Sequence, residues 1–182
     1  MNLKQEFPKG LKIIVAGDGG IGKTTLVKCF CYRKFHKNQK LTVGMDFYSK
    51  EVIINGKIEM LNIWDLGGQE TYRKIIKDYP ENAKGAILGF ELPRIATFYN
   101  LIKWLDLLKK SNEEFPIILV GTKIDLEYHS LNVPDMAKNF IIEHNLIDYI
   151  EVSSKNFYNI DLPFKILLSK VKECPIESIK IN

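Results

Sequence analysis

The chain has 182 residues, of which 46% are hydrophobic and 26% charged, and 26 basic residues against 22 acidic ones give a net charge of +4. This is the balance of a globular protein of one domain, which we expect to span residues 1–182, and it excludes disordered and fibrous classes. Lysines scattered along the chain are typical of a solvated surface, so we expect no nucleic-acid partner. The first residues carry no apolar stretch of the signal-peptide kind, and the three cysteines cannot pair completely. We therefore expect a cytoplasmic protein.

The first third of the chain predicts a buried strand, a helix and a hairpin. Residues 11–16 form a short apolar run that ends at a glycine-rich turn, which indicates a buried first strand. A helix is predicted to begin near Gly22. Residues 46–54 and 57–64 are rich in strand-forming residues and flank Asn55-Gly56, a strong signal for a two-residue hairpin turn.

The rest of the chain alternates between helical and strand patterns. Tyr72, Ile75, Ile76 and Tyr79 fall at helical spacing, and this stripe either packs on the sheet or contributes to a partner surface. Strands are predicted over 85–90, 116–120 and 149–152, and helices over 98–108, 134–144 and 160–171. The alternation predicts an α/β fold with a six-stranded, mainly parallel sheet, one antiparallel hairpin pair and helices on both faces. In such sheets ligands bind beyond the carboxyl ends of the strands.

One motif lies at the first of these strand ends. Residues 17–24, Gly-Asp-Gly-Gly-Ile-Gly-Lys-Thr, match G-x-x-x-x-G-K-[ST] between a predicted strand and a predicted helix. In this motif backbone N–H groups turn toward phosphates, and the start of the helix adds partial positive charge. Lys23 would reach the β- and γ-phosphates, and the Thr24 hydroxyl would bind Mg²⁺. The candidate binding residues here are Gly19, Gly20, Ile21, Gly22, Lys23, Thr24 and Thr25. A plain connecting turn is the alternative, and the motif leaves the base and the reaction open.

Four further stretches carry a resemblance to the Ras superfamily of small GTPases over nearly the whole chain. Residues 65–70, Asp-Leu-Gly-Gly-Gln-Glu, resemble that family's D-x-x-G-Q-E in Arf-like wording, and residues 42–47 resemble the switch I of Rab proteins. Residues 121–126, Gly-Thr-Lys-Ile-Asp-Leu, resemble the guanine motif N-K-x-D, and residues 153–155 resemble the S-A-K loop. The resemblance implies a P-loop NTPase of the small G-domain type that binds GTP and GDP with Mg²⁺ and hydrolyses GTP slowly.

The guanine motif has a chemical reason. The Asp125 carboxylate can accept hydrogen bonds from N1–H and the 2-amino group of guanine, whereas adenine would leave it unpaired. The stem of Lys123 can lie on the face of the base. The resemblance adds Phe35 as an aromatic that covers the base, and the loop Ser153, Ser154 and Lys155, whose backbone N–H groups can donate to guanine O6. Thr122 stands where the family usually has asparagine, but some Rho-type members share it, so guanine specificity should survive.

The resemblance also implies a mechanism. Thr24 and Thr42 would bind Mg²⁺ directly and Asp65 through water, and backbone N–H groups of Thr42 and Gly68 would hold the γ-phosphate. Loss of that phosphate would release both segments. Gln69 would orient the attacking water, so Gln69 and Lys23 are the candidate catalytic residues.

Gln39 occupies the positions of both an in-cis arginine and the switch I tyrosine of relatives. Without the arginine we expect turnover on the order of 10⁻⁴ to 10⁻³ s⁻¹, the range of Ras itself. The expected partners are effectors at the switch regions, an activating protein that supplies an arginine, and an exchange factor.

The last residues do not form a C-a-a-X box and Asn2 excludes N-myristoylation, so no lipid anchor is evident. We therefore expect a cytoplasmic protein that a partner can recruit to membranes. Two alternatives to the switch enzyme remain at this point. One is a GTP-binding interaction module with negligible hydrolysis, and the other is a P-loop kinase, which the three arginines and the guanine motif make unfavourable.

Overall fold

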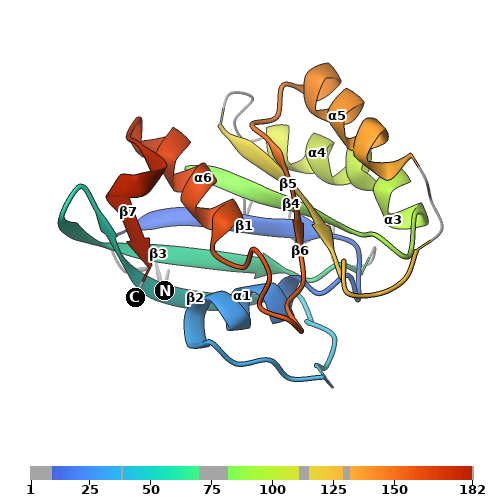
Figure 1. Cartoon of the computed structure of the whole chain (residues 1–182), viewed down its shortest axis with the longest axis horizontal. Coiled ribbons are helices and arrows are strands. Elements are labelled where there is room, and N and C mark those ends of the chain that lie inside the picture. The colour runs from blue at the N-terminus through green and yellow to red at the C-terminus, as the bar shows by residue number, and fades with distance from the viewer. Residues whose placement is uncertain (1–9, 38, 70–81, 111–114, 129–131, 182) are drawn as a thin grey trace, which may run out of the picture.

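A seven-stranded mixed sheet forms the centre of the computed structural model, which describes residues 10–37, 39–69, 82–110, 115–128 and 132–181 (Figure 1). The strands are β1 (Leu11–Gly17), β2 (Met45–Ile54), β3 (Lys57–Leu66), β4 (Gly85–Glu91), β5 (Ile117–Thr122), β6 (Tyr149–Val152) and β7 (Ile179–Ile181). Their order across the sheet is β6-β5-β4-β1-β3-β2-β7. Strands β3, β1, β4, β5 and β6 run parallel, while β2 is antiparallel to both of its neighbours.

Helices cover both faces of this sheet, as predicted. They are α1 (Lys23–Tyr32), α3 (Ala96–Tyr99), α4 (Leu101–Lys109), α5 (Val133–His144) and α6 (Leu162–Lys172), with a 3₁₀ turn η2 (Ile176–Ser178). Helices α3, α4 and α5 bury one face and α1 and α6 the other (Figure 1). Strand β1 serves both cores, because alternate residues point to opposite faces: Ile14 packs toward α4 and Ile13 toward α1.

The hairpin is confirmed at the predicted turn. Asn55 and Gly56 have φ of 50° and 75°, the left-handed pair that a two-residue type I′ turn requires. Ile54 pairs with Lys57, and the register continues along the strands to Met45 opposite Leu66.

Two predicted features differ from the structure. The expected sheet of six strands has a seventh, because Ile179 and Ile181 pair antiparallel with Ile54 and Val52 at the outer edge of β2. A three-residue strand has no periodicity of its own, so its partner decides whether it forms. The helix expected over 98–108 is divided at Asn100, whose side chain bonds to Asp18.

The predicted stripe from Tyr72 to Tyr79 lies outside the described residues. Within the described ranges, no helix combines the length and the apolar character that crossing a bilayer would require.

The parallel strands direct their carboxyl ends toward one edge of the sheet. The glycine-rich loop follows β1, residues 67–69 follow β3, and residues 92–94 follow β4. The segments 123–126 and 153–155 follow β5 and β6. The topology therefore brings five segments that are distant in sequence to one place.

Candidate functional site

A cavity of about 540 Å³ opens at this edge, within the size range of small-molecule sites. It gathers nearly all the residues predicted from the motifs: Gly19, Gly20, Ile21, Gly22, Lys23, Thr24, Thr25, Phe35, Thr42, Gly68, Gln69, Thr122, Lys123, Asp125, Ser154 and Lys155. The other two predicted residues, Asp65 and Ser153, contact side chains that line the cavity. Asp65 accepts a hydrogen bond from Thr24, and Ser153 donates one to Asp125. The segment after α1 adds His36, Lys37, Gln39, Lys40 and Leu41 to the wall.

Lys23 is the buried cation at the floor of this cavity. Its ammonium donates to the carbonyl oxygens of Gly17 at 2.7 Å and Asp18 at 2.8 Å. Burial lowers the pKa of Lys23 to about 8, while the carboxylates of Asp65 and Asp18 oppose that shift. An anionic ligand in the cavity would favour the charged form further, since opposite charge favours ionisation.

Three oxygen-bearing side chains meet beside Lys23. The Thr24 hydroxyl donates to the Asp65 carboxylate, and it lies 2.8 Å from the Thr42 hydroxyl, which is itself 3.5 Å from Asp65 Oδ2. Asp65 is fully buried, and in the described part of the chain its Oδ1 has no hydrogen-bond partner.

This trio fits a magnesium site. Hydroxyl and carboxylate oxygens are the hard donors that Mg²⁺ prefers. Burial raises the pKa of Asp65 to about 6, against the opposing effects of the Lys23 charge and the Thr24 hydrogen bond. A bound divalent cation would keep the carboxylate ionised and would satisfy its unpartnered oxygen.

The opposite end of the cavity holds Asp125. Its side chain is 8% exposed, the Ser153 hydroxyl donates to its Oδ1 at 2.6 Å, and the Lys155 ammonium lies 4.0 Å from its Oδ2. Backbone hydrogen bonds between Ser153 and Tyr158 hold that loop in place. Each carboxylate oxygen accepts more than one hydrogen bond, so Asp125 keeps acceptor capacity for a ligand in the cavity.

Thr122 lies under the glycine-rich loop and is buried. Its hydroxyl is 2.6 Å from the Ile21 carbonyl and 2.9 Å from the Phe90 carbonyl. One hydroxyl proton serves one of these acceptors at a time, whereas an asparagine amide would offer two protons. Thr122 therefore joins β5 to the loop with one donor proton, where an asparagine amide would supply two.

The segments around Thr42 and Gly68 pack against each other and the glycine-rich loop. A Cβ on Gly68 would lie 2.2 Å from the Gly19 nitrogen, so no other residue fits there without a shift of the backbone. The Gly67 N–H donates to the Gly44 carbonyl at 2.8 Å, and Gln69 follows into the cavity wall. The side-chain oxygen of Gln39 accepts a hydrogen bond from the Lys28 ammonium at 2.8 Å.

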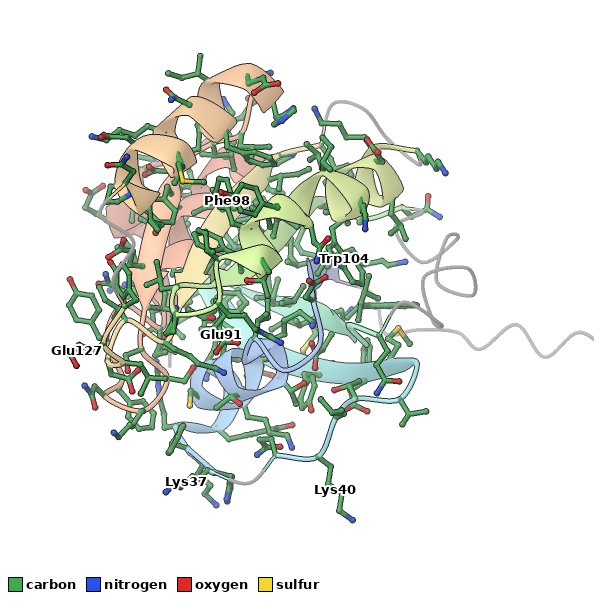
Figure 2. The ribbon with its side chains drawn as sticks, turned by 90° about the vertical axis from the view of Figure 1, so that its right-hand side faces the viewer. Lys37, Lys40, Glu91, Phe98, Trp104 and Glu127 are labelled. Atoms are coloured by element: carbon green, nitrogen blue, oxygen red, sulfur yellow. The ribbon has the colours of Figure 1, made fainter. Side chains whose placement is uncertain are left out.

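Two groups of residues at the site were missed from the sequence. The Asp18 carboxylate accepts hydrogen bonds from Asn100 Nδ2 at 2.7 Å and from the indole N–H of the buried Trp104 at 2.9 Å. Glu91 and Arg94 lie beside the glycine-rich loop, and Figure 2 shows Glu91 between α1 and the α3–α4 segment. Because both follow a predicted strand at its carboxyl end, the topological rule could have identified them. In contrast, Lys37 and Lys40 extend outward from the segment after α1 (Figure 2).

Comparisons with known proteins agree with the motifs. The model of the Ras family matches residues 12–173. The Ras-related protein rab-11.1 of Caenorhabditis elegans is 32% identical over 167 residues, which cover 91% of this chain and 79% of that protein. The Ras-related protein Rab-11A of Dictyostelium discoideum is 32% identical over 169 residues, which cover 92% of this chain and 78% of that protein.

Proposed function

The chain belongs to the Ras family, and from this premise we propose which of its residues perform the reaction of a small GTPase, within one G domain. The protein is a molecular switch that binds GTP and GDP with Mg²⁺ and hydrolyses GTP. The family assignment does not favour the alternative of an interaction module with negligible hydrolysis. The observation that carries the residue assignments is one cavity lined by the glycine-rich loop, Thr24, Thr42 and Asp125, with Asp65 accepting a hydrogen bond from Thr24.

The phosphates bind at the glycine-rich loop in this proposal. Backbone N–H groups of residues 19–25 donate to them, and the Lys23 ammonium exchanges the carbonyls of Gly17 and Asp18 for the β- and γ-phosphate oxygens. Thr24, Thr42 and Asp65 would hold Mg²⁺. The ion would supply positive charge that neutralises the phosphates.

Hydrolysis depends on position and charge. Gln69 orients a water molecule toward the γ-phosphorus, a bond forms to the water oxygen, and the bond to the bridging oxygen breaks, so that GDP and phosphate result. Lys23 stabilises the developing negative charge. Since Gln39, held by Lys28, stands where an in-cis arginine would be, we propose slow turnover that an activating protein accelerates with its own arginine.

Guanine is selected at the other end of the cavity. The Asp125 carboxylate accepts from N1–H and the 2-amino group, with its orientation held by Ser153. The aliphatic stem of Lys123 and the ring of Phe35 enclose the base, and the loop of Ser154 and Lys155 faces guanine O6. Adenine offers neither donor to Asp125, so a desolvated carboxylate would be left unpaired.

Membership of the family implies effectors, activating proteins and exchange factors in general. We propose that the segments near Thr42 and Gly68 present the effector surface, because both change when the γ-phosphate leaves. We also propose a cytoplasmic protein that a partner recruits to membranes. Partition of the full-length protein between cytosol and membrane fractions tests this last point.

The residue assignments are tested by direct binding. Calorimetry with GDP, GTP and ATP, each with and without Mg²⁺, should give tight binding of both guanine nucleotides and none of ATP at comparable concentration. Asp125→Ala should lower guanine-nucleotide affinity, and Glu127→Ala, an exposed carboxylate nearby, should not. ATP bound as tightly as GTP would contradict the role of Asp125.

A further inference from the structure

The backbone carbonyls of the glycine-rich loop accept hydrogen bonds from three cationic side chains and one hydroxyl. The carbonyls of Gly17 and Asp18 accept from Lys23. The Gly19 carbonyl accepts from Arg94 Nη2 at 2.7 Å, and the Gly20 carbonyl accepts from Lys123 Nζ at 3.0 Å. The Ile21 carbonyl accepts from Thr122. Every carbonyl from residue 17 to residue 21 therefore has a side-chain donor.

These bonds fix the direction of the loop N–H groups. All peptide bonds in the described chain are trans, so the C=O and N–H of one peptide unit point in opposite directions. The Gly19 carbonyl shares its unit with the Gly20 N–H. Arg94 is not among the residues that line the cavity, whereas Gly20 is, so a hydrogen bond from Arg94 to the Gly19 carbonyl is compatible with a Gly20 N–H that points the other way, toward the cavity.

A single carboxylate anchors two of these donors. Glu91, at the end of β4, has a side chain 13% exposed; its Oε2 pairs with Arg94 Nη2 at 2.9 Å, and its Oε1 pairs with Lys123 Nζ at 2.9 Å. Glu91 thus connects the loop that carries the phosphates to the lysine assigned to the base.

The network is poorly suited to a role in overall stability. The Arg94 side chain is 47% exposed, and ion pairs at such positions contribute little to the free energy of unfolding because water and salt screen them. The network should instead affect the affinity of the glycine-rich loop for an anion, because that affinity depends on the orientation of the backbone N–H groups.

We propose that Arg94, anchored by Glu91, is a positioning residue that orients the Gly19–Gly20 peptide so that the Gly20 N–H donates to a nucleotide phosphate. The proposal rests on the proposed nucleotide site and adds to it two residues outside the family motifs. Arg94 acts through the peptide unit, and no atom of Arg94 need contact the nucleotide.

The test compares Arg94→Ala, Arg94→Lys and Glu91→Gln with Arg33→Ala. Arg33 is a matched control, since it is 43% exposed and forms a two-bond ion pair with Asp161 away from the loop. The readouts are release of radiolabelled GDP, the ³¹P resonance of the β-phosphate of bound GDP, single-turnover GTP hydrolysis and the urea midpoint.

Arg94→Ala should release GDP roughly tenfold faster and shift the β-phosphate resonance, because one charge-assisted hydrogen bond that orients the peptide is lost. Arg94→Lys should restore part of the slow release, since lysine keeps the positive charge and its N–H donors but lacks the rigid planar guanidinium that fixes the position of Arg94 Nη2. Glu91→Gln should also release GDP faster, and Arg33→Ala should match the unmodified protein. Urea midpoints should stay close together.

Release and resonance unchanged in Arg94→Ala would overturn the proposal. So would unchanged release with slower hydrolysis, which would assign Arg94 to the reacting phosphate. If Arg94→Ala does not fold, the same criteria apply to Arg94→Lys and Glu91→Gln. An unmodified protein that binds no GDP would contradict the proposed function itself, which separates that failure from a failure of Arg94 alone.

Discussion

Replacing Thr122 with valine removes one hydroxyl and almost nothing else. Valine has nearly the same shape, so no cavity forms, but the carbonyls of Ile21 and Phe90 lose the donor that lies 2.6 and 2.9 Å away. Because Thr122 is only 4% exposed, water cannot readily replace the hydroxyl. The net hydrogen bond and the penalty for a buried carbonyl without a donor together predict a loss of about 1–3 kcal/mol. That range corresponds to a change of roughly 5- to 150-fold in an equilibrium constant.

The hydrogen bonds to the two carbonyls should affect different measurements. Phe90 belongs to β4, so loss of the hydrogen bond to its carbonyl should lower the urea midpoint. The Ile21 carbonyl belongs to the same peptide unit as the Gly22 N–H, so loss of the hydrogen bond to it should speed GDP release. Thr122→Ser keeps the hydroxyl and is the matched control. Thr122→Asn supplies two amide protons and should slow GDP release relative to the unmodified protein. If Thr122→Val equals Thr122→Ser in both measurements, the hydrogen bonds assigned to Thr122 contribute nothing and the reasoning fails.

Three further changes have defined outcomes. Gln69→Leu should slow single-turnover GTP hydrolysis at least about tenfold while GDP release stays the same, because only the orientation of water is lost; equal hydrolysis would remove Gln69 from the mechanism. Chelation of Mg²⁺ should speed GDP release at least about tenfold, since Thr24 and Asp65 would hold an ion that neutralises phosphate charge in the GDP-bound form; release that is indifferent to chelation would contradict these two side chains as part of a metal site. Ile179→Ala should lower the free energy of unfolding by about 2–4 kcal/mol, because Ile179 is 1% exposed and pairs with β2, whereas Ile58→Ala, at a residue 70% exposed, should leave it nearly unchanged. Equal urea midpoints for these two isoleucine variants would mean that β7 does not pack in solution.

Features encoded by neighbouring residues could be predicted from the sequence. The hairpin turn at Asn55-Gly56 needs only the conformational preferences of two residues, and the glycine-rich loop needs a short motif between a strand and a helix. The gathering of Asp125 and Thr24 at one cavity followed from the rule that parallel strands end at a common edge.

The features that could not be predicted depend on partners far away in the chain. Strand β7 forms because Ile179 pairs with Ile54 of β2, and a pattern of three residues is too short to predict that pairing. The position of Arg94 after a predicted strand could have placed it near the site, but its hydrogen bond to a backbone carbonyl 75 positions earlier could not be predicted, because every residue type offers the same backbone acceptor. Asn100 interrupts an otherwise helical pattern where its side chain bonds to Asp18, which only the folded arrangement brings near.

The hydrogen bond between Trp104 and Asp18 gives the protein an optical reporter of its own. The sequence contains two tryptophans, and the second, Trp64, lies on β3 with its ring 6.1 Å from that of Phe47. In a Trp64→Phe background, all indole fluorescence arises from Trp104, whose N–H is bonded to the carboxylate inside the glycine-rich loop. We expect the emission of that single ring to change as nucleotide enters and leaves, because the environment of its N–H is set by the glycine-rich loop.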